Sequence, residues 1–183
     1  MYKIIALMGK AGSGKDTMLH KIMEHSPHFH EIVSCTTRPK RDGESEGVNY
    51  FFLTPEQFND KVNQNKMLEY TCFNDWYYGT SYDSLKEDTI NVGVFNPAGV
   101  RSLLQHSDVE VYVYYITAPP KTRLLRQLNR EQNPDVNEII RRYTTDEKDF
   151  SYLYFNYSII PNEIYEDLNT GAMEIVSRFE NSR

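Results

Sequence analysis

The sequence is short of cysteines and of long apolar runs, and both shortages exclude classes of protein. Its 183 residues include only Cys35 and Cys72, which are too few for a disulfide framework. No uncharged apolar run approaches the ~20 residues that cross a bilayer. The apolar start of the chain, residues 4–8, is shorter than a signal peptide requires. We therefore expect a cytoplasmic chain without a membrane partner.

A basic excess is also missing, because 20 Lys and Arg stand against 26 Asp and Glu, for a net charge of −6. Nucleic-acid-binding domains usually carry the opposite excess, so we expect no nucleic-acid partner. What is present is a globular balance of 39% hydrophobic and 25% charged residues, which excludes a disordered chain. The length suits one domain over residues 1–183, either as a monomer or as a homodimer.

The alternation of strand-like and helix-like segments predicts an α/β fold. Apolar runs typical of buried strands cover residues 2–8, 32–34, 90–95, 109–116 and 158–160. Helical patterns cover residues 16–25, 97–106, 121–130, 136–150 and 164–179. Strands that alternate with helices form parallel sheets covered on both faces. We therefore expect a three-layer α/β/α domain around a parallel central sheet.

Residues 33–83 have a different pattern and predict a small β-rich insert. Short strand-like runs at 50–53, 67–72 and 76–78 surround a polar loop, a turn at 74–75 and one helix. That helix begins with Thr54, Pro55 and Gln57 in the spacing of a capping box. We expect the insert to stand on a core made of residues 1–32 and 84–183.

A glycine-rich segment, GKAGSGKDT, joins the first expected strand to the first helix and matches the pattern G-x-x-x-x-G-K. Its glycines allow backbone conformations that point several N–H groups inward, and the helix amino terminus adds partial positive charge. A loop of this kind binds the phosphates of a nucleoside triphosphate, with Lys15 at the β- and γ-phosphates. A glycine-rich turn without a ligand is the alternative. The residues predicted to bind the donor are Gly9, Lys10, Ala11, Gly12, Ser13, Gly14, Lys15, Asp16 and Thr17.

Asp16 stands where this pattern usually has serine or threonine, whose hydroxyl binds Mg²⁺. A carboxylate is also a hard oxygen ligand, so Asp16 can hold the ion directly or through water. Alternatively, Asp16 is only a favourable charge at the helix start and Thr17 supplies the hydroxyl. We favour the metal, because a carboxylate beside a triphosphate is repulsive without a cation between them.

A second cluster follows the expected strand at 32–34. Arg38 and Arg41 lie in its polar loop, and two guanidinium groups there suit a phosphate monoester, which each can bind in a bidentate way. The hydroxyl groups of Tyr50 and Tyr78 can donate to the same phosphate. A solvated basic loop is the alternative.

The run SCTTRPKRDGE, followed by GVNYFF, Glu69 and WYYGT, resembles guanylate kinase. Together with the phosphate loop and with residues 129–130 and 138–143, the resemblance covers nearly the whole chain. It implies that ATP, with Mg²⁺, donates a phosphoryl group to a nucleoside monophosphate, GMP or dGMP. It also implies that residues 33–83 bind the monophosphate and that residues from about 126 to 142 form a helical lid.

The resemblance further implies roles for single residues. Ser34 and Glu69 would read the guanine edge with help from Thr80, because the Glu69 carboxylate matches the adjacent N1–H and amino donors of guanine. The implied monophosphate-binding residues are Ser34, Arg38, Arg41, Tyr50, Glu69, Tyr78, Gly79, Thr80 and Asn96. The implied catalytic residues are Lys15, Arg38, Arg130 and Arg142. Helix geometry supports Arg142, which lies beside the apolar face of its helix, whereas Arg141 points away.

The chain departs from the family pattern at three places. The family's Asp-x-Asp at the end of the third core strand is replaced, and Val94 and Asn96 stand there. Pro161 takes the place of the family's asparagine after the last strand, with Asn162 next to it. Asp16 returns a carboxylate to the phosphate site. These departures indicate a divergent member of the family, either with an altered nucleotide preference or of phage type.

Three other functions are open at this stage. The same scaffold can phosphorylate another monophosphate, such as dTMP or a sugar phosphate. Guanylate-kinase-like modules also occur as non-catalytic phosphopeptide binders, although Gly14, Lys15 and the Arg38–Arg41 pair favour an enzyme. A metal site built from His25, His28 and His30 lacks a completing cysteine or carboxylate, so we expect surface histidines there.

Overall fold

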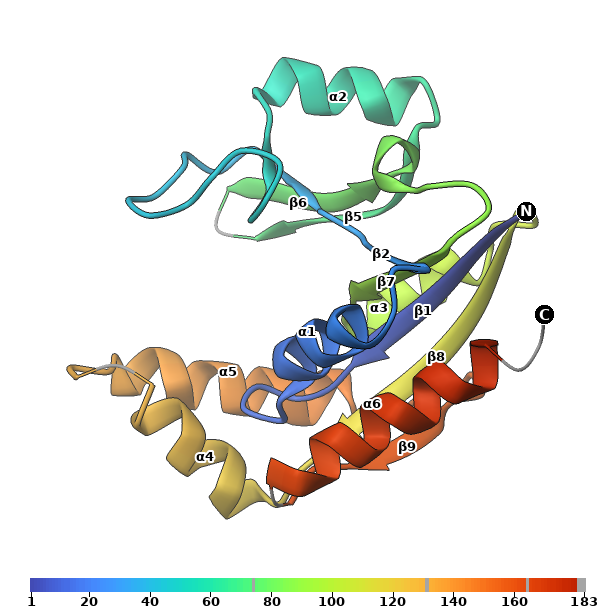
Figure 1. The fold of residues 1–183 in the computed structure, drawn as a ribbon. Coiled ribbons are helices and arrows are strands. Elements are labelled where there is room, and N and C mark those ends of the chain that lie inside the picture. Colours follow the sequence, from blue (N-terminus) through green and yellow to red (C-terminus); the bar gives the residue numbers. More distant parts are fainter. Residues whose placement is uncertain (74, 131, 164, 181–183) are drawn as a thin grey trace.

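Five parallel strands form the central sheet of the computed structural model, which describes residues 1–73, 75–130, 132–163 and 165–180. Their order across the sheet is β2-β7-β1-β8-β9, and each neighbouring pair runs parallel. The strands are β1 (Tyr2–Met8), β2 (Phe29–Glu31), β7 (Ile90–Val94), β8 (Val109–Thr117) and β9 (Ser158–Pro161). Because β1 is the central strand, the segment that follows it opens at the middle of the sheet's carboxyl edge (Figure 1).

Helices cover both faces of this sheet. On one face α1 and α6 lie side by side, and Leu7, Ile22 and Ile175 are fully buried beneath them. On the other face Met8 and Val100 are fully buried where α3 packs. The helices of the layers and of the segment between β8 and β9 are α1 (Lys15–His25), α3 (Pro97–Leu103), α4 (Pro120–Leu128), α5 (Val136–Asp149) and α6 (Tyr165–Glu180). This arrangement confirms the predicted α/β/α fold class.

A second, four-stranded sheet lies between β2 and β7 along the chain and above the central sheet in Figure 1. Its order is β4-β3-β6-β5, with β3 and β4 parallel and the other pairs antiparallel. Its elements are β3 (Cys35–Thr36), β4 (Phe51–Phe52), α2 (Pro55–Asn63), β5 (Met67–Phe73), β6 (Trp76–Ser81) and a 3₁₀ turn (Tyr82–Ser84). The capping box predicted at Thr54 is present, with both reciprocal bonds to Gln57. Phe58 of α2 is fully buried and stacks on Tyr77 of β6.

The strand predicted at residues 32–34 is wrong. The edge strand is β2, which ends at Glu31, and residues 32–34 carry the chain from one sheet to the other. The segment is extended because its backbone bonds to both sheets. The Ile32 N–H donates to the Val92 carbonyl, and the Phe51 N–H donates to the Ser34 carbonyl. A segment that crosses between sheets can have the apolar pattern of a strand without the regular hydrogen bonds to a neighbouring strand.

The helix predicted at 136–150 is present as α5, but its apolar residues are not core residues. No side chain of α5 is buried, and Val136 and Ile140 are 49% and 57% exposed. Periodicity therefore found the helix and overstated its packing. Two other predictions, the first residue of the turn at 74–75 and the start of the last helix at 164, lie outside the described residues. No described helix has both the length and the apolar character that a membrane span needs.

Candidate active site

The phosphate loop has the left-handed backbone conformations that its glycines predict. Gly12 and Gly14 have φ of +77° and +92°, the left-handed region that non-glycine residues rarely adopt. A Cβ on Gly12 would lie 2.4 Å from the Arg123 carbonyl oxygen, so α4 packs directly against the loop. The Ser13 N–H closes the loop by donating to the Lys10 carbonyl at 3.0 Å. The amide groups of this tight turn therefore lead into the amino terminus of α1.

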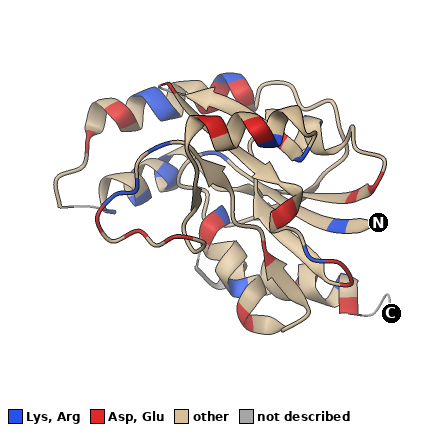
Figure 2. Cartoon of the chain, turned by 90° about the horizontal axis from the view of Figure 1, so that it is seen from above, with Lys and Arg blue, Asp and Glu red and all other residues tan. Residues whose placement is uncertain are grey.

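A hollow of about 550 Å³ opens in front of this loop. Lys15, Asp16 and Thr17 line one side of it, and arginines from α4, the segment after it and α5 line the other. The arginines are Arg126, Arg130 and Arg142. In Figure 2, basic and acidic segments are interspersed on the side away from the two chain ends, where α4, α5 and the phosphate loop lie in Figure 1. The structure thus brings the predicted Arg130 and Arg142 to the same hollow as Lys15.

Arg126 and Asn162 belong to this hollow and were not among the predicted site residues. Arg126 donates to the carbonyl groups of Gly12 at 3.4 Å and of Asn162 at 3.3 Å. Asn162 is fully buried, and its Nδ2 donates to the Ser13 carbonyl at 2.6 Å. A signal for Arg126 was available, since it lies one helical turn before Arg130. Pro161 only ends β9, so Asn162 is the residue that reaches the loop.

Asp16 projects into the donor hollow from the first turn of α1. Its carboxylate is largely exposed, with Oδ2 at 3.7 Å from the Lys15 Nζ. Among the described residues no cluster of three or more His, Cys, Asp or Glu side chains forms a metal site. One carboxylate with the Thr17 hydroxyl nearby fits Mg²⁺, which binds proteins through few groups and keeps phosphate and water ligands. The three histidines form no such cluster, and His30 Nε2 lies 3.0 Å from the Ser84 carbonyl.

The acceptor loop holds Arg38 in a fixed orientation. Arg38 is 8% exposed, and its Nη1 and Nη2 donate to the two carboxylate oxygens of Glu44 at 2.9 and 2.8 Å. The guanidinium carbon lies 5.5 Å from the centre of the Tyr50 ring and 5.7 Å from that of Phe52. The pairing uses the Nη1–Nη2 edge and leaves the Nε–Nη2 edge, a second donor pair that suits a phosphate.

Glu44 is the ionic partner of Arg38, and the sequence prediction did not include it among the site residues. The hydrogen bonds from Arg38 and from the Arg41 N–H lower the pKa of Glu44 to about 2, so it stays ionised at neutral pH. The Arg41 side chain itself is exposed beside this pair. Glu44 stood in the quoted run RDGE, and its spacing of six residues from Arg38 gave no local signal.

Glu69 and Thr80 face each other on β5 and β6, as the predicted base-reading pair requires. Burial raises the pKa of Glu69, and the neighbouring Thr80 only partly offsets this. The Thr80 Oγ1 is buried with no hydrogen-bond partner among the described residues. Gly79 allows close packing here, because a Cβ on it would lie 2.4 Å from the Glu69 carbonyl oxygen. A buried acceptor beside an unused hydroxyl can bind a polar ring edge.

Asn96 caps α3 at the border of this pair. Its Oδ1 accepts from the Gly99 N–H at 2.7 Å. That oxygen and the Glu69 Oε2 each lie 3.4 Å from where a Cβ on Gly99 would be, so Asn96 and Glu69 approach the same point. Val94 ends β7 beside Leu7 and offers no polar group in the described structure. Ser34 is half-buried where the chain crosses between the sheets.

The two tyrosines of the acceptor cluster contact each other. The rings of Tyr50 and Tyr78 meet edge to face at 6.2 Å. Burial raises the pKa of Tyr50 against the lowering effect of Arg38, and the carboxylate of Asp16 is close enough to add to the rise. Asp16 belongs to the donor hollow, so the acceptor tyrosine lies within electrostatic reach of the phosphate loop.

The two arginines of α5 share one carboxylate. The Nε of Arg142 lies 2.7 Å from Glu138, and Arg141 pairs with both oxygens of the same side chain. These bonds lower the pKa of Glu138 to about 2. Arg141, which sequence reasoning left as a solvated residue, also stacks on the Phe73 ring of the second sheet at 4.8 Å. It therefore links α5 to the end of β5.

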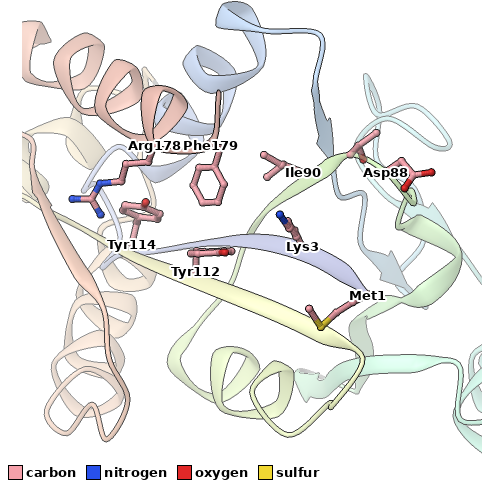
Figure 3. A pocket seen from close by; sticks show the side chains of 9 residues that line it. Met1, Lys3, Asp88, Ile90, Tyr112, Tyr114, Arg178 and Phe179 are labelled. Carbon is pink, nitrogen blue, oxygen red and sulfur yellow. The ribbon is translucent and has the colours of Figure 1, made fainter. Parts of the chain in front are cut away.

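A further hollow of about 480 Å³ lies at the opposite edge of the sheet (Figure 3). Figure 3 shows Lys3 of β1, Tyr112 of β8 and Phe179 of α6 around it. These residues lie at the amino-terminal end of the strands, whereas the phosphate loop follows their carboxyl ends. The two hollows share no residue, so this one plays no part in the site above.

Comparison with known proteins agrees with this geometry. A family model described as guanylate kinase matches residues 1–176. The chain belongs to the guanylate kinase family. A guanylate kinase of Shouchella clausii is 34% identical to this family member over 154 residues, which cover 80% of this chain and 72% of that protein. One of Mycoplasma genitalium is 27% identical over 184 residues, covering 97% of this chain and 76% of that one.

The fold of this guanylate kinase family member is also found in a solved relative. The crystal structure of guanylate kinase from Anaplasma phagocytophilum matches it with a TM-score of 0.68 and 21% identity. The match covers 99% of this chain and 86% of the other. At this identity the likeness shows the fold, and the sequence matches carry the family membership.

Proposed function

We propose that this chain transfers the γ-phosphoryl group of ATP to the phosphate of GMP or dGMP, which yields ADP and GDP or dGDP. One observation carries the proposal. The phosphate loop and three arginines line one hollow, and Arg38 of the acceptor loop is buried between the Glu44 carboxylate and the rings of Tyr50 and Phe52. The sequence relatives bear the name guanylate kinase, in line with this reaction.

The residues act by binding and by neutralising charge. On the donor side Lys15 and the loop amides hold the β- and γ-phosphates, and Arg130 and Arg142 approach the transferring group. On the acceptor side Arg38, Arg41, Tyr50 and Tyr78 hold the monophosphate. An anionic oxygen of that phosphate attacks the γ-phosphorus in line with the departing ADP oxygen. No general base is required, because the attacking oxygen carries no proton to remove.

Base selection belongs to the pair on β5 and β6. The ionised Glu69 carboxylate accepts from N1–H and the amino group of guanine, while Ser34 and Thr80 offer hydroxyl groups to the remaining edge. Adenine lacks these adjacent donors, so it leaves a buried carboxylate unpaired, which costs about 1–3 kcal/mol or more. The oxygen of Asn96 approaches the same point and completes this side.

Mg²⁺ fits the donor hollow, with Asp16 and Thr17 as the protein groups near it. When bound, the ion neutralises the negative charge of the β- and γ-phosphates. We expect Asp16→Ser to lower kcat and to raise the Mg²⁺ concentration needed for half-maximal rate. Calorimetry of Mg²⁺ with ADP-loaded protein gives a second readout, in which the variant binds the ion more weakly. Unchanged Mg²⁺ dependence in both assays contradicts a metal role for Asp16.

The proposal includes movement of two segments, a cellular compartment and an oligomeric state. Residues 33–83 carry the monophosphate as an insert on a core of residues 1–32 and 84–183, and a lid of about residues 126–142 closes over the donor and excludes water. The cytoplasm is the expected compartment from the low cysteine content. Either a monomer or a homodimer is compatible with the site, which is assembled within one chain.

A panel of ribo- and deoxynucleoside monophosphates with ATP tests the function. We expect GMP or dGMP to give the highest kcat/KM, and Lys15→Met to abolish turnover, which excludes a contaminating kinase. A preference for dTMP or a sugar phosphate would move the proposal to another acceptor on the same scaffold. Failure of the protein to bind ATP in calorimetry contradicts an enzyme and favours a binding module.

A further inference from the structure

The carboxyl end of α5 contacts the first residues of the phosphate loop. The Glu147 Oε2 lies 2.6 Å from the Lys10 Nζ, and its Oε1 lies 3.1 Å from the Arg123 Nη2. The carboxylate of Asp146 accepts from the Ala11 N–H at 2.5 Å. Two neighbouring residues of α5 thus bind the loop: Glu147 binds the Lys10 side chain, and Asp146 binds the Ala11 backbone amide. The bonds from Lys10 and Arg123 also lower the pKa of Glu147.

Arg123 makes this contact more than a surface ion pair. It is 3% exposed, and its guanidinium carbon lies 4.9 Å from the centre of the Tyr143 ring. Its carbonyl packs against Gly12, and its Nη1 has no hydrogen-bond partner in the described structure. Glu147 is the carboxylate paired with this buried charge. A buried cation whose single ionic partner lies on another helix ties the two helices to one relative position.

The pairing of Glu147 with Arg123 also fixes the position of Arg142 on α5. Arg142 lies five residues before Glu147 and one helical turn before Asp146, which places it about 6–8 Å along the helix from the anchored end. No side chain of α5 is fully buried, and its apolar restraint comes at its end, where Phe150 stacks on Tyr115. The contacts at Asp146 and Glu147 are therefore the main polar restraint between α5 and the donor hollow that Arg142 lines.

We propose that Glu147 is a positioning residue for phosphoryl transfer, which acts through Lys10 and Arg123 to hold Arg142 over the donor phosphates. The inference rests on the proposed kinase function. Glu147 touches no reacting atom in this account. A role in stability alone would make the protein less stable without linking Glu147 to Arg142.

The first experiment compares Glu147→Gln with Asp149→Asn, which removes the same charge at the end of the same helix. Asp149 is exposed and makes no hydrogen bond or ion pair in the described structure. We expect Glu147→Gln to lower kcat about tenfold to 100-fold, the range for misplacing one transition-state cation, with the GMP KM changed less than twofold. Asp149→Asn should match the wild type. Equal effects of the two variants overturn the proposal.

The second experiment asks whether Glu147 acts through Arg142. The double variant Glu147→Gln with Arg142→Met should be no slower than Arg142→Met alone, and its affinity for a non-hydrolysable ATP analogue should show the same lack of further loss. Multiplicative losses in both readouts overturn the proposal. If the loss of the Arg123 partner prevents folding, Glu147→Asp serves instead, because it keeps a carboxylate for Arg123 and should also be non-additive with Arg142→Met.

Different results contradict the kinase function and the positioning role of Glu147. If the wild-type protein phosphorylates none of the monophosphates, the proposed function is contradicted. The analogue-binding cycle still measures whether Glu147 and Arg142 are coupled. An active enzyme with independent Glu147 and Arg142 effects contradicts the positioning role alone.

Discussion

Arg38 illustrates how a single side chain is prepared for an anion before the anion arrives. Glu44 bonds one edge of its guanidinium, and two aromatic rings lie against it. Side-chain entropy that would otherwise be lost on binding is therefore lost during folding. The acceptor phosphate needs only the remaining edge of Arg38.

Without Glu44 to hold Arg38, binding of the acceptor GMP should become weaker, and binding of the donor ATP should not change. We expect Glu44→Gln to raise the KM of GMP roughly tenfold, which is about 1.4 kcal/mol, and to leave the KM of ATP unchanged. Asp42→Asn in the same loop is the control and should behave as the wild type. Steady-state kinetics with each substrate varied in turn measures both constants. A parallel rise in the ATP KM would show a general disturbance of the fold.

Glu69 should make base recognition depend on pH. Burial raises its pKa, so it takes up a proton at a higher pH than an ordinary glutamate does. Its protonated form loses an acceptor that guanine needs, and the KM of GMP should therefore rise as the pH falls through this raised pKa. In Glu69→Gln the GMP KM should be high and should no longer follow that titration. Equal loss of kcat/KM for every base would contradict the assignment.

The same group should have the opposite effect on stability. A carboxyl group whose pKa is raised in the folded state favours folding below its unfolded pKa and loses that contribution as the pH rises through the folded pKa. Ionised Glu69 therefore destabilises the protein at pH 7. We expect Glu69→Gln to raise the melting temperature at pH 7 and to lose this advantage in acid, as measured by thermal unfolding at both pH values.

At the scale of elements, the phosphate loop depends on the helix behind it. Gly12 and Gly43 both have positive φ, but a Cβ on Gly12 would meet the Arg123 backbone and one on Gly43 would meet nothing within 4 Å. We expect Gly43→Ala to cost about 1–2 kcal/mol of unfolding free energy from its backbone conformation alone. Gly12→Ala should cost clearly more, because a backbone atom must also move. Denaturant unfolding of both variants checks this, and equal costs would contradict the contact.

The sequence predicted the elements that have strong local signals. The phosphate loop, the capping box at Thr54 and the strand at residues 109–116 all depend on neighbours in the chain, and each was found. The crossing at 32–34 was taken for a strand, because pairing with a distant partner leaves no mark on the crossing segment itself. Glu44, Arg126 and Asn162 were missed for the same reason, since their partners are set by tertiary packing.

At the scale of the whole molecule, two segments are inserted between strands of the central sheet. The second sheet is inserted between β2 and β7, and α4 and α5 are inserted between β8 and β9 (Figure 1). Arg141 on Phe73 is a contact between these two insertions. Each insertion is also tied to the core, because Leu68 of β5 is buried in one cluster with Met8 of β1, and Phe150 after α5 packs against the same cluster.

Closure of the two insertions can be measured from a natural label site. Cys72 is exposed on β5 and Cys35 is buried, so a thiol probe should react with Cys72 alone. With a second probe at Asn129→Cys after α4, we expect the probe separation to shorten when ADP and GMP are added together and to change less with either alone. Double electron–electron resonance measures this distance. A separation that ignores both nucleotides contradicts closure.

The bond between Asp146 and the Ala11 N–H has a consequence for the order of events. Ala11 lines the donor hollow, so a triphosphate bound there brings negative charge close to the Asp146 carboxylate, and the two anions repel. The nucleotide should therefore break the bond between Asp146 and the Ala11 N–H, while Glu147 stays paired with Lys10 and Arg123. Donor binding would then leave α5 held by Glu147 alone, and the helix could rotate about this contact toward the bound nucleotide.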